Sequence, residues 1–232
     1  MKTKDRILQA SLKLFNEKGE RNVSTNHIAA NLGISPGNLY YHYRNKNEIV
    51  FQLFLKYQEE VQEFLAVPAH RPITYQDKVQ YFEAILGSMW DYRFLHRDLH
   101  QLLLENDGLR LAYRNFSIRT VSDGREILST MVSAGLMKAT PEQVDALIVN
   151  IWVTVVSWSS FLQTTSIQPD GGTSMGRDML KRAIFQIISL EEPYLCDSIK
   201  PLLPALKQKY LGGLSSDPLA LFPSLLTDVD QL

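Results

Sequence analysis

The chain of 232 residues contains a single cysteine, Cys196. One thiol excludes an internal disulfide and the paired cysteines of zinc knuckles, and it fits a reducing compartment such as the cytoplasm. The sequence also lacks a Gly-x-Ser-x-Gly turn, a glycine-rich phosphate loop and any unbroken apolar run that approaches membrane-spanning length. We therefore expect no catalytic residues, no cofactor, no metal site and no membrane contact.

The chain as a whole also lacks an excess of charge of either sign. It carries 24 Lys and Arg against 25 Asp and Glu, a formal net charge of −1. Residues 1–56 hold nine of the basic side chains and four of the acidic ones, a balance of +5, so the remainder carries −6. A basic segment on an acidic body is expected when one segment alone meets a polyanion, although a solvated basic face fits the same numbers.

Residues 24–46 contain two short helix patterns separated by a sharp turn. Ser24 is a favourable N-cap for the first helix, and Gly33 ends it because glycine adopts the left-handed conformation without a steric penalty. Ser35 caps the second helix, and Pro36 fits its first position because the amide there would be unpaired anyway. This arrangement predicts a helix-turn-helix that reads duplex DNA.

The second helix of this motif should bury Leu39, which lies four residues from Tyr43, and expose polar groups on its other arcs. Asn38 offers an amide that pairs with adenine, and Gly37 lets the backbone approach a base edge. Core packing and DNA contact are both open for Tyr40 and Tyr43. Groups suited to phosphate oxygens surround both helices, as side chains or as free amides at the helix starts, at Ser24, Thr25, Ser35, Pro36, Tyr41, His42 and Lys46.

Three segments of the first fifty residues resemble the DNA-binding domain of the TetR family of bacterial transcription regulators. They are RILQASLKLFNEKG at residues 6–19, STNHIA with LGIS at residues 24–35, and GNLYYHY at residues 37–43 followed by Asn45 and Lys46. The resemblance implies base contacts at Pro36, Gly37 and Asn38, and phosphate contacts at Thr25, Ser35, Tyr40, Tyr41, His42 and Lys46. Family members often carry a polar or basic residue where Pro36 stands, so base readout at that position should be weak or steric.

The rest of the chain has a helical pattern almost throughout, which predicts an all-α fold. We expect a three-helix helix-turn-helix DNA-binding domain at residues 1–46, a helical ligand-binding and dimerisation domain at 47–211, and a partly ordered tail at 212–232. Helices are predicted at residues 46–65, 75–92, 95–105, 109–134, 141–162, 174–190 and 199–211. Prolines and glycines predict breaks at residues 68–72, 169–172 and 192–193.

Residues 146–161 are apolar on nearly every side, so a helix there must be covered all round. A second copy of the chain would supply one side of that cover, and the resemblance implies that the last two long helices form a dimer interface. The alternative is a central helix in a monomer. The predicted interface residues are Ile148, Ile151, Val155, Trp158, Ile184 and Ile187.

Aromatic and apolar side chains at helical spacing in the body predict a ligand pocket, although such stripes also occur in ordinary cores. The predicted lining is Phe82, Met89, Trp90, Phe94, Leu103, Tyr113, Phe116 and Trp152. Arginines at residues 93–119 favour an acidic or acyl-type effector, and solvated helix faces are the alternative interpretation of these arginines.

The resemblance implies a cytoplasmic repressor rather than an enzyme. It would bind a pseudo-palindromic, double-stranded DNA operator as a homodimer, and a small apolar or acyl-type effector would release it. The alternative function is a DNA-binding architectural or partner-binding protein without a small-molecule effector.

Overall fold

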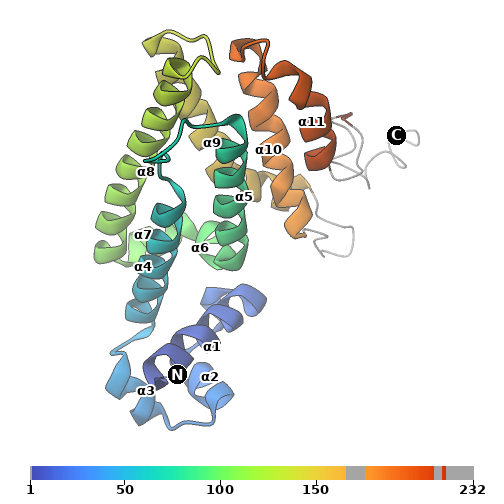
Figure 1. The fold of residues 1–232 in the computed structure, drawn as a ribbon. Helices are drawn as coiled ribbons and strands as arrows, with labels where there is room; N and C mark the ends of the chain where they lie inside the picture. The colour runs from blue at the N-terminus through green and yellow to red at the C-terminus, as the bar shows by residue number, and fades with distance from the viewer. Residues whose placement is uncertain (1, 166–175, 212–215, 218–232) are drawn as a thin grey trace, which may run out of the picture. The chain divides into compact units, whose positions relative to one another are not determined.

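The computed structural model describes residues 2–165, 176–211 and 216–217, and these residues form helices and no β-strand (Figure 1). The all-α prediction is confirmed. The helices group into two compact units, one of Met1–Phe64 with Ser88–Arg119 and one of Leu65–Gly87 with Thr120–Leu232. The predicted domain boundaries stay predictions. The predicted break at residues 169–172 and most of the predicted tail lie outside the described residues.

The first unit contains the helix-turn-helix and the helices that follow it in the chain. Its helices are α1 (Thr3–Lys18), α2 (Thr25–Leu32), α3 (Pro36–His42), α4 (Lys46–Phe64), α6 (Arg93–Arg97) and α7 (Leu99–Glu105). α5 (Tyr75–Asp91) and α8 (Asp107–Ser133) each contribute residues to both units. α1 packs on α2 and α4 through an apolar face that includes Ile7 and Phe15, each 0% exposed.

The predicted helix at residues 95–105 is wrong as a single element, because the structure divides this segment at Asp98. Asp98 has φ −113° and ψ 18°, outside the α-helical region. Its carboxylate lies 3.3 Å from the Arg97 guanidinium. Aspartate is a weak helix former because its side chain competes with the backbone for hydrogen bonds, so a break at this residue is physically reasonable.

The second unit is built around α9 (Pro141–Thr165), α10 (Arg177–Glu191) and α11 (Leu203–Leu211). α10 packs against both α9 and α11. Ion pairs hold α11 in place, since Lys207 lies 2.5 Å from Glu192 and Lys209 lies 2.9 Å from Glu83. Because α10 has α9 and α11 as neighbours, every side chain between Leu180 and Glu191 is buried or half-buried.

A buried ion pair joins α5 to α10 inside the second unit. The Lys78 ammonium donates to the Glu191 carboxylate, and the two side chains are 3% and 0% exposed. The ammonium also lies 4.4 Å from the centre of the Tyr75 ring and 5.8 Å from that of Phe82. Burial lowers the pKa of Lys78, because desolvation disfavours the charged form.

Residues 146–161 of α9 are apolar on nearly every side, as predicted, and within the part of the chain that the structure describes some of these apolar side chains are buried and others are exposed. Ile148, Ile151 and Val155 are at most 8% exposed, whereas Val149 is 54% and Val153 is 52% exposed. The helix is also long and apolar enough to pass a length and composition test for a membrane span, with a mean hydropathy of 1.5. Core helices of soluble proteins pass this test too, and α9 is not an unbroken apolar run, because Asn150, Thr154 and Ser157 interrupt it.

Candidate nucleic-acid interface

The first helix of the helix-turn-helix, α2, begins with a capping box. The Ser24 hydroxyl accepts a hydrogen bond from the His27 amide, and the His27 Nδ1 accepts one from the Ser24 amide, each at 3.3 Å. Glutamate or glutamine usually occupies the position of His27 in this motif. The two bonds satisfy amides that a helix start leaves free, and they fix the beginning of α2 at Thr25.

The turn between the two helices depends on Gly33, as predicted. Gly33 has φ +65° and ψ 30°, and its amide donates to the Ala30 carbonyl at 3.2 Å. The next amide, that of Ile34, donates back to the Ala29 carbonyl at 3.1 Å. A side chain would strain this left-handed conformation, so glycine is the residue that lets α3 follow α2 so closely.

α3 is anchored on one side and open on the other. Leu39 is 0% and Tyr43 is 1% exposed, so these two residues fix the helix to its unit. The Ser35 hydroxyl accepts from the Asn38 amide at 3.2 Å and caps the helix. The exposed residues at its start are the three predicted base contacts, Pro36, Gly37 and Asn38.

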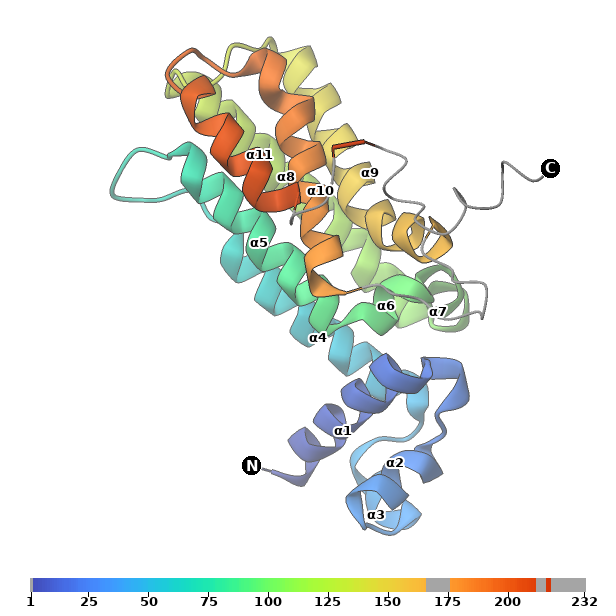
Figure 2. The same cartoon turned by 90° about the vertical axis from the view of Figure 1, so that its right-hand side faces the viewer.

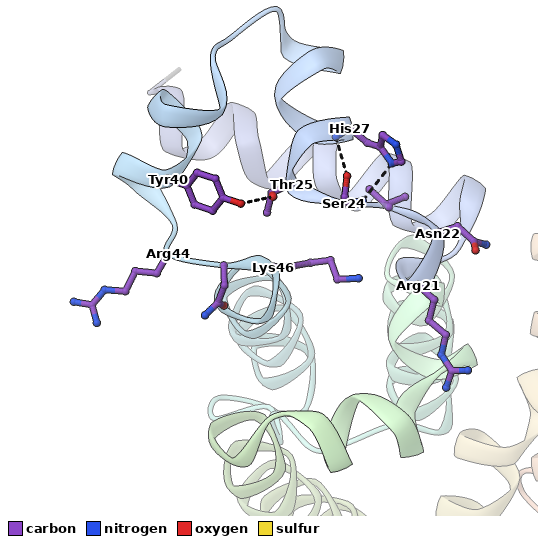
Figure 3. A pocket seen from close by; sticks show the side chains of 10 residues that line it. Arg21, Asn22, Ser24, Thr25, His27, Tyr40, Arg44 and Lys46 are labelled. Carbon is purple, nitrogen blue, oxygen red and sulfur yellow. Dashed lines mark hydrogen bonds between the residues drawn. The ribbon is translucent and has the colours of Figure 1, made fainter.

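A groove of about 470 Å³ lies beside α2 and α3 (Figure 3). Arg21, Arg44 and Lys46 bring positive charge to it from three parts of the first unit, and no acidic side chain is among its lining residues. The lining consists of Arg21, Asn22, Val23, Ser24, Thr25, His27, Tyr40, Arg44, Asn45 and Lys46. A cationic groove rich in hydroxyl and amide groups is suited to the phosphate backbone of nucleic acid.

The predicted phosphate contacts Thr25 and Tyr40 lie together in this groove, where their hydroxyl oxygens are 3.0 Å apart (Figure 3). Tyr40 is 49% exposed, so this residue is not part of the core, unlike Tyr43. Tyr41 is 84% exposed and packs edge-on against His42, with ring centres 5.1 Å apart. The Tyr41 ring therefore remains available to an outside partner, while His42 is half-buried.

Lys46 has a structural partner that the sequence did not reveal. Its ammonium lies 2.8 Å from the Glu20 carboxylate and donates to the Glu20 carbonyl at 3.1 Å. The Glu20 side chain is 4% exposed, so this ion pair ties the start of α4 to the segment between α1 and α2. An ammonium has three N–H groups, so a further bond from Lys46 to a phosphate is still chemically possible.

Arg21 and Arg44 are groove residues that the sequence-based site did not include. Figure 3 shows their side chains at opposite ends of the groove. The Arg44 amide donates to the Glu48 carboxylate at 2.7 Å, while its guanidinium has no ion pair within the described part of the chain. The sequence did contain a signal for these two residues. Each flanks one of the two helices of the motif, and each contributes to the +5 charge of residues 1–56.

Arg44→Gln and Lys46→Gln should separate a phosphate contact from a structural ion pair. Arg44→Gln should lower the slope of log affinity against log salt by about 0.9 for each bound subunit, as expected for one lost phosphate contact per chain, and leave the melting temperature unchanged. Lys46→Gln should also lower the melting temperature, because it leaves the buried Glu20 carboxylate without its partner. Binding titrations at several salt concentrations and thermal melts test this. Equal melting temperatures for the two variants would contradict it.

The residues of the predicted ligand pocket divide between the two units. Phe82 and Trp152 lie in the second unit, and the other six lie in the first. Phe94 packs against Phe15 with ring centres 5.2 Å apart, and Phe116 lies 5.8 Å from Phe54. His96 joins the same aromatic region, and burial lowers its pKa to about 4, so its imidazole is neutral at pH 7. The pocket itself stays a prediction.

Comparison with known proteins identifies the family. A model described as bacterial regulatory proteins of the tetR family matches residues 7–53, and a model described as bacterial transcriptional repressor matches residues 56–201. A TetR-family transcriptional regulator from Marinobacter aquaeolei VT8 is 42% identical, with a TM-score of 0.82 over 90% of this chain and 99% of that one. The chain belongs to the TetR family, and it is a DNA-binding transcriptional regulator rather than an enzyme.

Other relatives agree over shorter or more distant matches. An HTH-type transcriptional regulator of Staphylococcus aureus is 41% identical over 51 residues, which is 22% of this chain and 28% of that protein. A second is 27% identical over 100 residues, 43% of this chain and 52% of that protein, so the chain spans about half or less of these relatives. The regulator PfmR from Thermus thermophilus, at 24% identity and a TM-score of 0.60 over 81% of this chain and 98% of that one, shows the fold.

Proposed function

We propose that this regulator is a cytoplasmic repressor that binds a pseudo-palindromic operator as a homodimer. The observation that carries the proposal is the exposed run of Pro36, Gly37 and Asn38 next to the cationic groove. The exposed run can meet base edges in a major groove, while Arg21 and Arg44 meet the phosphates on either side. One short helix touches few bases, so two copies about 34–36 Å apart are needed for a selective site.

The outer side of α9 supports the dimer. Val149 and Val153 are more than half exposed and Phe161 is 36% exposed, and residues 146–165 carry no charged side chain. An uncharged apolar face matches a second copy of itself better than it matches a charged partner. The six predicted interface residues are at most 8% exposed within one chain, so we move the proposed contact to Val149, Val153 and Phe161.

A small effector fits the same proposal. Phe54, Tyr57, Tyr113 and Phe116 form an aromatic cluster in the first unit, with ring centres about 6 Å apart. Such a cluster suits an apolar or aromatic ligand with few polar groups. Distant fold relatives have been solved in complex with triclosan and with choline. An effector that binds better to a form with displaced DNA-binding helices would release the operator by a population shift.

Selection of genomic fragments by the purified full-length chain tests the proposal. We expect the bound fragments to share a motif with two related halves whose centres lie about 10–10.5 base pairs apart, or a multiple of this spacing. Bound fragments without two-fold symmetry would contradict the dimeric arrangement. No preference for any duplex at moderate salt would contradict operator recognition altogether.

Asn38→Ala should relax the base preference at one position in each half of the selected motif. A good bidentate contact between asparagine and adenine is worth about 1–3 kcal/mol of discrimination against other bases. Repeating the selection with the variant measures this loss. Asn31→Ala, which removes an exposed asparagine from α2, is the matched control and should leave the motif unchanged. An identical motif for the Asn38 variant would show that its amide does not read a base.

A further inference from the structure

Asn16, in the last turn of α1, uses both ends of its side-chain amide on residues far along the chain. Its Nδ2 donates to the Asp91 carbonyl at 2.7 Å, and its Oδ1 accepts from the Phe94 amide at 3.1 Å. Asp91 is the last residue of α5, and Phe94 lies in the first turn of α6. Backbone carbonyls at the end of a helix and amides at its start have no partner within the helix. Tyr92, the N-cap residue of α6, makes no side-chain cap. The Asn16 side chain therefore binds the end of α5 and the start of α6.

Further contacts fix the end of α1 to the same corner. The Arg97 guanidinium donates to the Phe15 carbonyl at 3.1 Å, and cations near a helix C-terminus are favourable. The buried rings of Phe15 and Phe94 pack with centres 5.2 Å apart. Gly19, with φ +86°, has no side chain, and a Cβ there would meet the guanidinium of Arg97 at 3.4 Å. Figure 2 shows α6 beside this end of α1.

Two further asparagines, Asn47 and Asn106, hold the start of α4. The Asn47 Nδ2 donates to the Glu105 carbonyl at 3.3 Å, and the Asn106 Nδ2 donates to the Asn47 carbonyl at 3.1 Å. Glu105 ends α7, and the Asn106 Oδ1 also accepts from the Leu109 amide in the first turn of α8. This contact therefore joins the start of α4 to the junction between α7 and α8.

These two contacts bracket the DNA-reading part of the chain. Residues 19–45, which include α2 and α3, lie between Asn16 at the end of α1 and Asn47 at the start of α4. Both asparagines bind residues of one segment, 91–106, which contains α6 and α7. All of these residues belong to the first unit. A shift of residues 91–106 therefore acts on the reading helices from both of their chain ends.

We propose that Asn16, with Arg97 as its neighbour, is a positioning residue that couples the DNA-reading helices to the corner at residues 91–98. The proposal rests on the proposed function and gives it a route: a ligand that displaces this corner changes DNA affinity through α1. Coupling is reciprocal. DNA bound at α3 must therefore change the free energy of displacing the corner by the same amount as the displacement changes the free energy of DNA binding. The coupling can therefore be measured with DNA alone, before any effector is known.

Hydrogen–deuterium exchange of the full-length chain tests this, with an operator duplex from the genomic selection as the probe. In the wild type, the duplex should slow exchange at α2 and α3 and also at residues 91–98, the latter by about fivefold or more. Asn16→Ala should keep the slowing at α2 and α3 and lose it at residues 91–98. Asn115→Ala is the matched control, because Asn115 is an exposed asparagine of α8 that is neither in the cationic groove nor in the Asn16 contacts, and it should behave as the wild type.

Asn16→Asp guards against a variant that fails to fold. It keeps an acceptor for the Phe94 amide and loses the donor to Asp91, so it should retain part of the slowing at residues 91–98. Slowing at α2 and α3 with no change at residues 91–98 in the wild type, or unchanged slowing there in both Asn16 variants, would overturn the coupling alone. No slowing at α2 and α3 with any selected duplex would refute the proposed function and the coupling with it.

Discussion

Lys78→Met should lower the free energy of unfolding by about 3–5 kcal/mol, because removing one partner of a buried ion pair leaves the other charge uncompensated. The Glu191 side chain is 0% exposed, and its second carboxylate oxygen has no hydrogen-bond partner in the described residues. Methionine matches the lysine stem in length, so the loss would come from the charge rather than from a cavity. Chemical denaturation measures the difference.

Lys200→Met is the matched control for this prediction. Lys200 pairs with Asp197 at 2.7 Å, but the two side chains are 52% and 90% exposed, and surface pairs contribute about 0–1 kcal/mol. The double variant Lys78→Met with Glu191→Leu should recover most of the lost stability, because no buried charge is left. Similar losses for the Lys78 and Lys200 variants would contradict the importance of burial for the α5–α10 pair.

Val153→Glu should convert the proposed dimer into monomers and weaken operator binding by about 100-fold or more. The added carboxylate would lie opposite its own copy across a two-fold axis, and the two like charges would repel. A monomer has one helix-turn-helix, so it loses the gain in affinity that comes from linking two of them. Val153 is 52% exposed in the single chain, so its replacement should leave the fold of each chain intact. Light scattering and operator titrations measure both effects.

Leu111→Glu is the control for the interface. Leu111 is 60% exposed and lies on α8 rather than on α9, so this variant should remain dimeric and bind DNA normally. A Val153→Glu variant that stays dimeric with unchanged DNA affinity would show that the copies meet elsewhere. The two variants carry the same added charge, so a general electrostatic effect on DNA binding would appear in both.

The helix-turn-helix could be predicted because its determinants are local. Ser24 and Ser35 cap the helices that follow them, and Gly33 takes the left-handed conformation that the turn requires. Each of these properties depends on a residue and its next few neighbours. The exposure of Pro36, Gly37 and Asn38 follows from the same local geometry, once Leu39 is known to face inward.

Features decided by distant partners could not be predicted in this way. Lys46 was interpreted as a cation for DNA, but its partner Glu20 lies 26 residues away and becomes a neighbour only in the folded unit. The separate helix α6 begins where Asn16, 78 residues earlier, accepts from the Phe94 amide. Local propensity contains no information on such contacts. The break at Asp98 is different, because the weak helix propensity of aspartate is a local signal that the prediction of one continuous helix did not weigh.

The predicted dimer residues stay a prediction, and their choice from the sequence has a related limit. An apolar pattern on every side of α9 shows that the helix needs cover, but it does not show which side the chain itself covers. The structure buries Ile148 and Ile151 within the second unit and leaves Val149 and Val153 outside. One position along a helix is a rotation of about 100°, which separates an internal core from an external contact.

The absence of charged side chains from residues 146–165 of α9 has a consequence for how the regulator would respond to its surroundings. Rising ionic strength would strip the protein from its operator, because that association depends on neutralised phosphates. The pairing of two valine-rich faces would persist, and it would loosen on cooling instead, because the hydrophobic driving force weakens as temperature falls. High salt would thus release the operator before the dimer separates, whereas cooling would weaken the dimer first.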